Sequence, residues 1–353
     1  MKILFLEPFY AGSHRRWCEE IQEFSSHDVH ILSLSGNHWK WRMHGAAVEF
    51  AENLNVKRIK YDLIIASDFL DLATFKSLFW DQRVPFALYF HENQITYPWS
   101  EKDQDVFLKR DNHYGWINFT SALVADCCFF NSNYHLRSFI QALPSFLAQF
   151  PDGNFKHSID LISKKSKVLH LGMKLNRKLK VKNMKPVILW NHRWEYDKNP
   201  SLFFQALEAV QDLDWELIVL GNSYEREPSE FSKYHSVFKD RIIQWGYVSE
   251  INDYHDMLAI ADILLTTSIQ DFFGGSVVEA IYAGAFPILP NRLAYMEHVS
   301  DRYLYNNESE LDDMLRLAIA EFSSWDSSTS KMVEKYNWVN CIAMYDEVFE
   351  TCI

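Results

Sequence analysis

Residues 270–287 read QDFFGGSVVEAIYAGAFP, and this stretch decides the fold. It follows the apolar run 261–267, which predicts a buried strand, and a helical pattern begins at the glycine pair 274–275. Adjacent glycines let backbone N–H groups approach a ligand closely, and a helix N-terminus favours negative charge. Asp271 and Glu279 flank the turn with carboxylates, which accept hydrogen bonds from ligand hydroxyl groups. The alternative is an ordinary strand–loop–helix unit with a capping acid.

Length and composition indicate a globular protein of two domains. The chain has 353 residues, 48% of them hydrophobic and 23% charged, which is enough material for two cores. Its formal net charge of −12 argues against a general nucleic-acid coat protein, because nonspecific binding depends on phosphate neutralisation. A local basic patch stays compatible with this charge.

The cysteines and the apolar runs indicate a cytoplasmic protein. The five cysteines are odd in number and form no CxxC pair, so we expect reduced thiols. Lys2 is followed at once by an apolar, strand-like run, so we expect no signal peptide. The longest apolar runs are too short to cross a bilayer, so we expect no membrane association.

The N-terminal half alternates short apolar strands with helices, which predicts a parallel α/β sheet. Gly12 is the only glycine of the loop expected at 7–14, so a GxGxxG dinucleotide fingerprint is absent and a dehydrogenase is disfavoured. Ligand groups are expected where strands end. The residues at these ends include Gly12, Ser13, His14, Asp68, His91, Glu92, Asn93, Gln94, Asn131 and Asn133.

The segment HWKWR at 38–42 alternates aromatic and cationic side chains. In a loop, Trp39, Trp41 and Arg42 could stack on nucleotide bases and pair with phosphates. A partly buried tryptophan pair under long basic side chains explains the same pattern.

The segment HENQ at 91–94 places a histidine, an acid and two amides at one strand end. A core would not leave such groups unpaired. Ligand binding and turn capping both explain Glu92 and Asn93, whereas ligand binding is the favoured interpretation for His91.

A basic run at 174–185 holds most of the clustered positive charge and marks the expected linker. It separates the strand expected at 168–171 from the one expected at 187–190. Such a run is usually a solvated face. On an acidic chain it is also the best place for an anionic macromolecule, with Lys178 and Lys180 as candidate contacts.

The second half restarts the α/β pattern. Arg193 and Lys198 follow its first strand with four residues between them. Fixed cations stabilise the negative charge that grows on a departing diphosphate, although a solvated pair would look the same in isolation. Two further strands end at Gly221 and at 246–249, and helical spacing in the tail 336–350 predicts a last helix.

The motif around Asp271 resembles the acid–x7–acid signature of retaining glycosyltransferases of the GT4 family, although the family usually has Glu at the first acid. The resemblance implies the GT-B fold: two Rossmann-like parallel-sheet domains facing a cleft, with the last helix crossing back. The domains would be 1–172 plus about 335–353, on the acceptor side, and 173–334, on the donor side.

The GT4 resemblance also implies roles for residues. His91, Arg193, Lys198 and Asp271 would be catalytic. A second group would bind the donor nucleotide sugar: Gly12, Ser13, Gly221, Tyr247, Val248, Phe273, Gly274, Gly275, Ser276 and Glu279. In that family Asp271 would contact the sugar, Glu279 the ribose and the Arg–Lys pair the diphosphate.

EPFYAGSHRRW, HWKWR, YFHENQITYP and FNSNYH, spread over the N-terminal half, resemble the tRNA-queuosine mannosyltransferase family. The resemblance implies transfer of mannose from GDP-mannose to the queuosine of tRNA-Asp, with retained configuration. The residues that would face this acceptor are His14, Trp39, Trp41, Arg42, Glu92, Asn93, Gln94, Asn133, Lys178 and Lys180.

We expect no cofactor and no metal ion, because arginine and lysine neutralise the diphosphate in this family and the sequence shows no ligand spacing. Two other functions fit the residues. One is a glycosyltransferase for a small-molecule, lipid or polysaccharide acceptor. The other is a non-catalytic nucleotide- or tRNA-binding protein.

Overall fold

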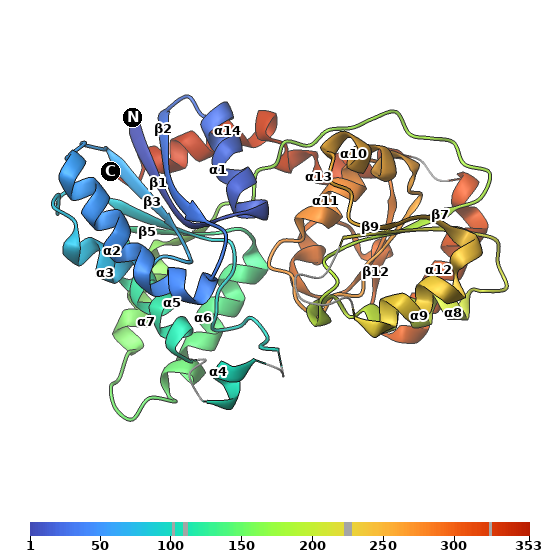
Figure 1. Cartoon of the computed structure of the whole chain (residues 1–353), viewed down its shortest axis with the longest axis horizontal. Coiled ribbons are helices and arrows are strands. Elements are labelled where there is room, and N and C mark those ends of the chain that lie inside the picture. The colour runs from blue at the N-terminus through green and yellow to red at the C-terminus, as the bar shows by residue number, and fades with distance from the viewer. Residues whose placement is uncertain (101–102, 109–111, 222–227, 325–326) are drawn as a thin grey trace. The chain divides into compact units, whose positions relative to one another are not determined.

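The computed structural model shown in Figure 1 describes residues 1–100, 103–108, 112–221, 228–324 and 327–353. The chain forms two compact units. The N-terminal unit comprises Met1–Met173 and Trp338–Ile353, and the C-terminal unit comprises Lys174–Asn337. No helix in the described ranges is both long enough and apolar enough to span a membrane.

The N-terminal unit contains a six-stranded sheet in the order β2-β1-β3-β4-β5-β6, whose described pairs are all parallel. Its strands are β1 (Lys2–Tyr10), β2 (Asp28–Ser35), β3 (Leu63–Ser67), β4 (Phe86–Phe90), β5 (Cys127–Phe130) and β6 (Ser166–Val168). Every residue of β3 and β4 is buried, as expected for strands covered on both faces.

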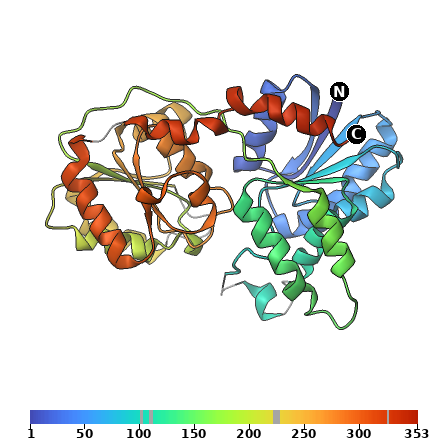
Figure 2. The ribbon, with the colours of Figure 1, turned by 180° about the vertical axis from the view of Figure 1, so that it is seen from behind.

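The helices of this unit cover the sheet. They are α1 (Gly12–Phe24), α2 (Trp39–Lys57), α3 (Leu72–Leu78), α4 (Gln104–Phe107), α5 (Asn112–Val124), α6 (Asn133–Leu147), α7 (Lys156–Lys165) and α14 (Trp338–Glu350). Helix α14 lies beside α1 in both views, red next to blue (Figure 2). The indole Nε1 of Trp338 donates a 2.6 Å hydrogen bond to Glu20 of α1.

The C-terminal unit contains a six-stranded sheet in the order β12-β11-β10-β7-β8-β9, also with parallel pairs. Its strands are β7 (Val187–Asn191), β8 (Glu216–Leu220), β9 (Ile242–Gly246), β10 (Ile263–Leu265), β11 (Phe286–Pro290) and β12 (Leu304–Tyr305). Its helices are α8 (Pro200–Ala209), α9 (Ser229–Val237), α10 (Ile251–Ile260), α11 (Gly275–Tyr282), α12 (Glu308–Glu321) and α13 (Ser330–Val333).

Strand order reverses once in each sheet. After β9 the chain returns to the other side of β7 and adds β10, and after β2 it returns to the other side of β1 and adds β3. Open parallel sheets bind ligands outside the carboxyl ends of the strands at such switch points. The predicted class of two parallel α/β units is therefore confirmed. In each unit, the expected ligand-binding edge lies at the carboxyl ends of the strands on either side of the switch point.

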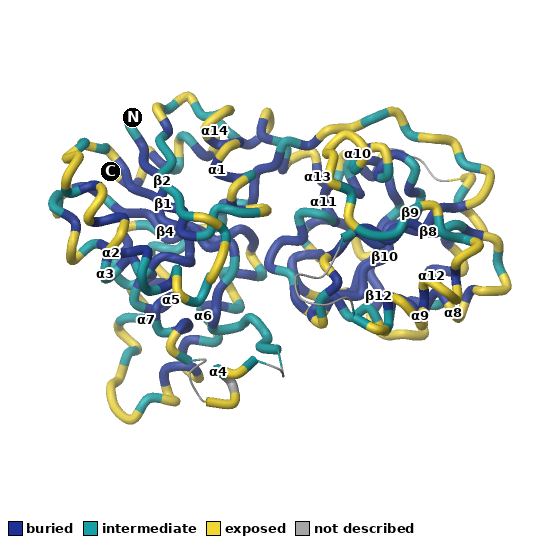
Figure 3. Tube along the Cα trace, viewed as in Figure 1, coloured by how far each residue is buried: buried dark blue, intermediate teal, exposed yellow. Residues whose placement is uncertain are grey.

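Each unit has its own hydrophobic core. The larger cluster of the N-terminal unit includes Phe50, Phe75 and Phe130, and that of the C-terminal unit includes Trp190 and Trp215. The sheets form the dark blue interior of each unit in Figure 3. Burying aromatic side chains of this size supplies the main favourable term in folding.

Two local predictions for the N-terminal unit are wrong. Residues 7–14 are not one loop, because β1 continues to Tyr10 by pairing with Ser35 of β2, and α1 begins at Gly12. The HWKWR segment is not a loop either. His38 takes a left-handed conformation with φ 56°, and α2 begins directly after it.

Candidate active site

The glycine-rich stretch forms the expected turn from β10 into α11 at the carboxyl edge of the C-terminal sheet. Gly274, the residue before the helix, has φ +82°, and a Cβ there would lie 2.9 Å from the ring of Tyr295. Backbone conformation and space both require glycine here. Because Gly274 offers no capping side chain, the first N–H groups of α11 at Gly275 and Ser276 can bind an anion.

Asp271 and Lys198 form a charged pair beside this turn. Their Oδ1 and Nζ atoms are 3.0 Å apart, and the side chains are 17% and 7% exposed. The ammonium also donates a 2.7 Å hydrogen bond to the carbonyl of Gln270 and lies 3.1 Å from Asp197. Burial favours a raised pKa for Asp271, but Lys198 and His192 outweigh it and lower that pKa. The carboxylate is therefore ionised and fixed.

Arg193, the other predicted cation, is exposed two residues beyond the end of β7. Lys198 lies in the same loop before α8, and β7 is the neighbour of β10. The sheet thus brings Arg193, Lys198 and Asp271 to adjacent loops at the switch point.

Glu279 lies on the first turns of α11, where its Oε2 accepts a 2.9 Å hydrogen bond from the hydroxyl of Tyr254. Asn191 at the end of β7 donates a 2.7 Å hydrogen bond to the carbonyl of Ser276. Its own Oδ1 is buried and, within the described residues, accepts no hydrogen bond. Two acceptor groups therefore lie near the start of α11. One is the Glu279 carboxylate, which Tyr254 orients, and the other is Oδ1 of Asn191.

Three other predicted donor residues occupy different environments. Gly221 has φ +97°, and a Cβ there would lie 2.1 Å from the carbonyl oxygen of His192. Tyr247 is 66% exposed, and Val248 next to it is half-buried. The ring of Phe273 is buried in the core against Tyr336, so that side chain is not a ligand surface.

In the N-terminal unit, Gly12 and Ser13 are exposed at the first turn of α1. Gly12 has φ +51°, and a Cβ at this position would meet no atom within 4 Å. The residue before the helix, Ala11, provides no side-chain cap. This turn therefore leaves backbone N–H groups available, as binding of a donor nucleotide sugar by Gly12 and Ser13 requires.

The HENQ segment is held by buried partners from the end of β3 and from α5. The N–H of His91 donates a 2.8 Å hydrogen bond to Asp68, which follows β3. The N–H of Gln94 donates to Asn118 on α5 at 2.7 Å, and its amide donates to Glu92 at 2.8 Å. Burial together with Glu92 and Glu7 outweighs the charge of His14 and raises the pKa of Asp68 to about 8.

The prediction that Asn93 faces an acceptor is wrong. Its side chain is fully buried, and its Oδ1 accepts hydrogen bonds from the N–H groups of Ile95 and Thr96 at 3.0 and 2.9 Å. This is the turn-capping alternative. Asn133, by contrast, is exposed in the first turn of α6.

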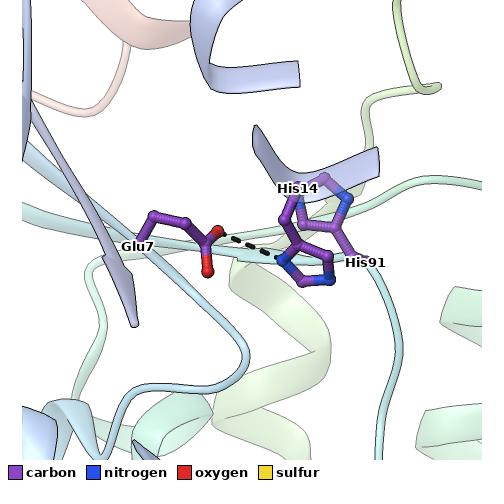
Figure 4. Close-up of side chains that lie close together, drawn as sticks. All are labelled: Glu7, His14 and His91. Carbon is purple, nitrogen blue, oxygen red and sulfur yellow. Dashed lines mark hydrogen bonds and ion pairs between the residues drawn. The ribbon is translucent and has the colours of Figure 1, made fainter. Parts of the chain in front are cut away.

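His14 and His91 lie together with Glu7, a residue that the sequence did not single out. Nδ1 of His14 is 3.1 Å from Oε2 of Glu7, drawn as the dashed line in Figure 4, and the two imidazole rings are 4.2 Å apart. Burial favours a lowered pKa for His14, but Glu7 outweighs it and raises that pKa to about 9. Burial lowers the pKa of His91, which is therefore neutral.

The tryptophans of HWKWR differ from each other. Trp39 packs in an aromatic group with Trp99 and Tyr114, at ring distances of 6.2 and 5.3 Å, so the buried-pair alternative holds for this residue. Trp41 is 64% exposed. Arg42 donates a 3.0 Å hydrogen bond to Ser35 and is half-buried.

The two candidate contacts of the basic run already have partners within the C-terminal unit. Lys178 donates to Asp256 of α10, and Lys180 donates to the carbonyl of Ala261. Burial lowers the pKa of Lys180. The expectation that Lys178 and Lys180 are open cations for an anionic macromolecule is corrected, because α10 and the residues after it already neutralise them.

Several residues of both edges escaped sequence reasoning. Tyr254 and Tyr295 carry no motif, and only tertiary contacts bring them to Glu279 and Asp271. Glu7 begins the EPFYAGSHRRW motif, but the sequence did not indicate that its side chain pairs with His14. His192 directly precedes Arg193 but was not singled out, and its buried Nε2 pairs with Thr266 at 3.1 Å.

Comparisons with known proteins assign a family model to each part of the chain. Residues 2–173 match the model described as tRNA-queuosine alpha-mannosyltransferase N-terminal, and residues 173–335 match glycosyl transferases group 1. The tRNA-queuosine alpha-mannosyltransferase of Drosophila melanogaster is 33% identical over 329 residues, 89% of this chain and 85% of that one. Soluble starch synthase 1 of Solanum tuberosum is 25% identical over 46% of this chain and 28% of its own.

Solved structures share the fold over the whole chain. Anabaena HepE in complex with UDP has a TM-score of 0.68 at 17% identity, covering 99% of this chain and 100% of that one. Sucrose-phosphate synthase of Thermosynechococcus elongatus has a TM-score of 0.72 at 13% identity, covering 99% of each. The two parallel units therefore have the GT-B fold.

Proposed function

The chain belongs to the tRNA-queuosine alpha-mannosyltransferase family, and from this premise we propose that it transfers mannose from GDP-mannose to the queuosine of tRNA-Asp. It is a glycosyltransferase with the GT-B fold. The donor, the sugar and the tRNA are the proposal. They rest on the name of the relative in Drosophila and on the residues described above.

One observation carries the proposal: the buried Lys198–Asp271 pair beside the glycine-capped start of α11. In our proposal Lys198, Arg193 and the N–H groups of α11 bind the diphosphate. Asp271 accepts hydrogen bonds from hydroxyls of the mannose. Its side chain is one methylene shorter than glutamate, and Tyr295 and Lys198 hold it in place.

Glu279 is the proposed ribose ligand. Its carboxylate can accept hydrogen bonds from two adjacent hydroxyls, and the hydroxyl of Tyr254 fixes its orientation. This contact is the same for GDP and GDP-mannose, so it contributes to nucleotide binding rather than to the rate of the chemical step.

The proposed reaction retains the sugar configuration. The bond between the anomeric carbon and the diphosphate oxygen breaks, and the anomeric carbon bonds to a hydroxyl oxygen of queuosine on the same face. The hydroxyl proton passes to an oxygen of the departing diphosphate. Cations fixed at the diphosphate stabilise the negative charge that develops there, and that stabilisation is greatest in the transition state.

The N-terminal unit supplies the proposed acceptor contacts. An anticodon loop is single-stranded, and its bases can be unstacked onto aromatic side chains. Trp41 is an exposed aromatic side chain that can do this, and His14, His91 and Gln94 offer polar groups at the strand ends. Lys178 and Lys180 already have partners within the C-terminal unit, so we propose that the N-terminal unit binds the tRNA.

A donor screen tests the proposal. The protein is incubated with tRNA from queuosine-making cells and, separately, with labelled GDP-mannose, UDP-glucose or ADP-glucose. We expect label on tRNA with GDP-mannose alone. Transfer from UDP-glucose or ADP-glucose only would reject the proposed donor, and label appearing on a small sugar but never on tRNA would favour the small-molecule alternative.

A further inference from the structure

Glu7, His14 and His91 come from three separate elements and converge in the N-terminal unit. Glu7 is on β1, His14 is in the first turn of α1, and His91 follows β4. One potential ligand atom from each residue lies within 4.8 Å of the other two, and all three residues are buried. Figure 4 shows Glu7 and His14 facing each other with the His91 ring alongside.

The spacing of these atoms fits a small divalent cation. Zinc binds imidazole nitrogen and carboxylate oxygen at ~2.0–2.2 Å, so two ligand atoms of a tetrahedral site lie roughly 3.3 Å apart. Oε2 of Glu7 and Nδ1 of His14 are 3.1 Å apart. The three ligand atoms lie within 4.8 Å of one another, so a ligand atom of His91 has to move closer by up to roughly 1.5 Å to complete a tetrahedral site.

A hydrogen bond from the main chain already orients the carboxylate of Glu7. The second oxygen of Glu7 accepts a 2.9 Å hydrogen bond from the N–H of Phe9. Asp68 accepts a 2.8 Å hydrogen bond from the backbone N–H of His91, which fixes the main chain there and not the imidazole ring. Hydrogen bonds to a ligating carboxylate, like the one to Glu7, are typical of metal sites, where they hold the coordinating atoms in position.

The ion pair between Glu7 and His14 gives no hydrogen-bond partner to the ring of His91. Within the described residues, Nε2 of His91 is buried and has no hydrogen-bond partner. A buried polar atom without a partner is costly.

We propose that Glu7, His14 and His91 bind one divalent transition-metal ion, with zinc as the best-fitting class. Two imidazoles and one carboxylate leave a fourth tetrahedral position for water or a substrate hydroxyl. Nitrogen ligands favour zinc over magnesium or calcium, which prefer oxygen ligands. The proposal goes beyond mannosyl transfer and gives His14 and His91, which are also proposed acceptor contacts, a second role as metal ligands.

A competition titration tests this site. The full-length protein is freed of metal by a chelator and titrated with Zn²⁺ against a chromophoric chelator. We expect one tight equivalent per chain. Glu7→Gln and His91→Gln should each weaken it by more than about 100-fold, because even the loss of an outer contact costs roughly 10–100-fold.

The control removes a different histidine pair of the same unit. His44 and His113 stack with ring centroids 4.6 Å apart, and the double variant His44→Gln/His113→Gln should keep the tight equivalent. X-ray absorption at the zinc edge should show two imidazoles among nitrogen and oxygen ligands. This measurement uses the unaltered protein, so it tests the site even if a variant fails to fold.

Two results would overturn the proposal. One is the absence of tight binding, which would leave Glu7 and His14 as an ion pair only. The other is an equivalent that survives Glu7→Gln and His91→Gln but disappears with the His44/His113 control. The titration uses no nucleotide, sugar or tRNA, so its failure is distinguishable from failure of the proposed function.

Discussion

At the residue scale, Arg193 and Lys198 should differ in what they do to the fold. Arg193 is exposed, whereas Lys198 is buried between Asp197 and Asp271. Arg193→Ala should therefore lower kcat by about 10²–10³-fold, the scale for losing one group that stabilises developing charge, with an unchanged Tm. Lys185→Ala, which removes an exposed lysine paired with Asp214, is the matched control and should keep full turnover.

Lys198→Ala should lower turnover and stability together. It leaves Asp197 and Asp271 as neighbouring buried acids without their shared cation, and breaking a buried pair costs about 3–5 kcal/mol. Thermal unfolding followed by circular dichroism gives the stability, and labelled transfer gives the rate. A fully active, equally stable Lys198→Ala protein would contradict the assignment.

Glu279 and Asp271 should separate nucleotide binding from sugar binding. Glu279→Gln should weaken GDP and GDP-mannose to the same extent, because the ribose is common to both. Asp271→Asn should weaken GDP-mannose and leave GDP unchanged. Calorimetry with both ligands measures this, and an unchanged affinity of Glu279→Gln for GDP would make Glu279 a purely structural helix residue.

At the element scale, the turn before α11 should tolerate no side chain. Gly274→Ala should destabilise the protein by at least about 1–2 kcal/mol from the left-handed backbone alone, and the contact with Tyr295 adds to that. Gly246→Ala is the matched control, because Gly246 has φ +103° but open space around a Cβ. Chemical denaturation should show the larger loss for Gly274→Ala, and equal losses would remove the argument from close packing.

Helix α14 should be held to the N-terminal unit by Trp338. Its Nε1 donates to the buried carboxylate of Glu20 at 2.6 Å, and hydrogen bonds to charged groups contribute ~1.5–3 kcal/mol. Trp338→Phe should lower the free energy of unfolding by about that amount in a urea titration. Val339→Ala, at an exposed neighbour, should change it little.

Elements were predictable where the signal was local. Apolar runs and the glycine pair predicted β10, α11 and most strands of both sheets. The length of β1 and the start of α2 were not predictable, because pairing with Ser35 and the left-handed conformation of His38 arise only in the folded chain. Asp271 and Lys198 were recognisable, whereas Tyr254 and Tyr295 reach the edge through contacts distant in sequence.

At the scale of the whole molecule, two parallel units each carry one half of the proposed chemistry. The C-terminal unit holds the donor residues at its switch point, and the N-terminal unit holds the polar cluster and the exposed Trp41. Trp41→Ala should weaken tRNA binding while leaving GDP affinity unchanged, because base stacking contributes about 1–3 kcal/mol. Filter binding with tRNA measures the first quantity and calorimetry the second; equal tRNA affinity would exclude Trp41 from the interface.

The central claim is that queuosine in tRNA is the acceptor. The most direct measurement incubates the protein and labelled GDP-mannose with tRNA from cells that make queuosine and with tRNA from cells that cannot. We predict label on the first tRNA pool only, carried by the queuosine nucleoside after digestion. Equal label on both pools, or label on neither pool while GDP-mannose is consumed on another acceptor, would contradict the account.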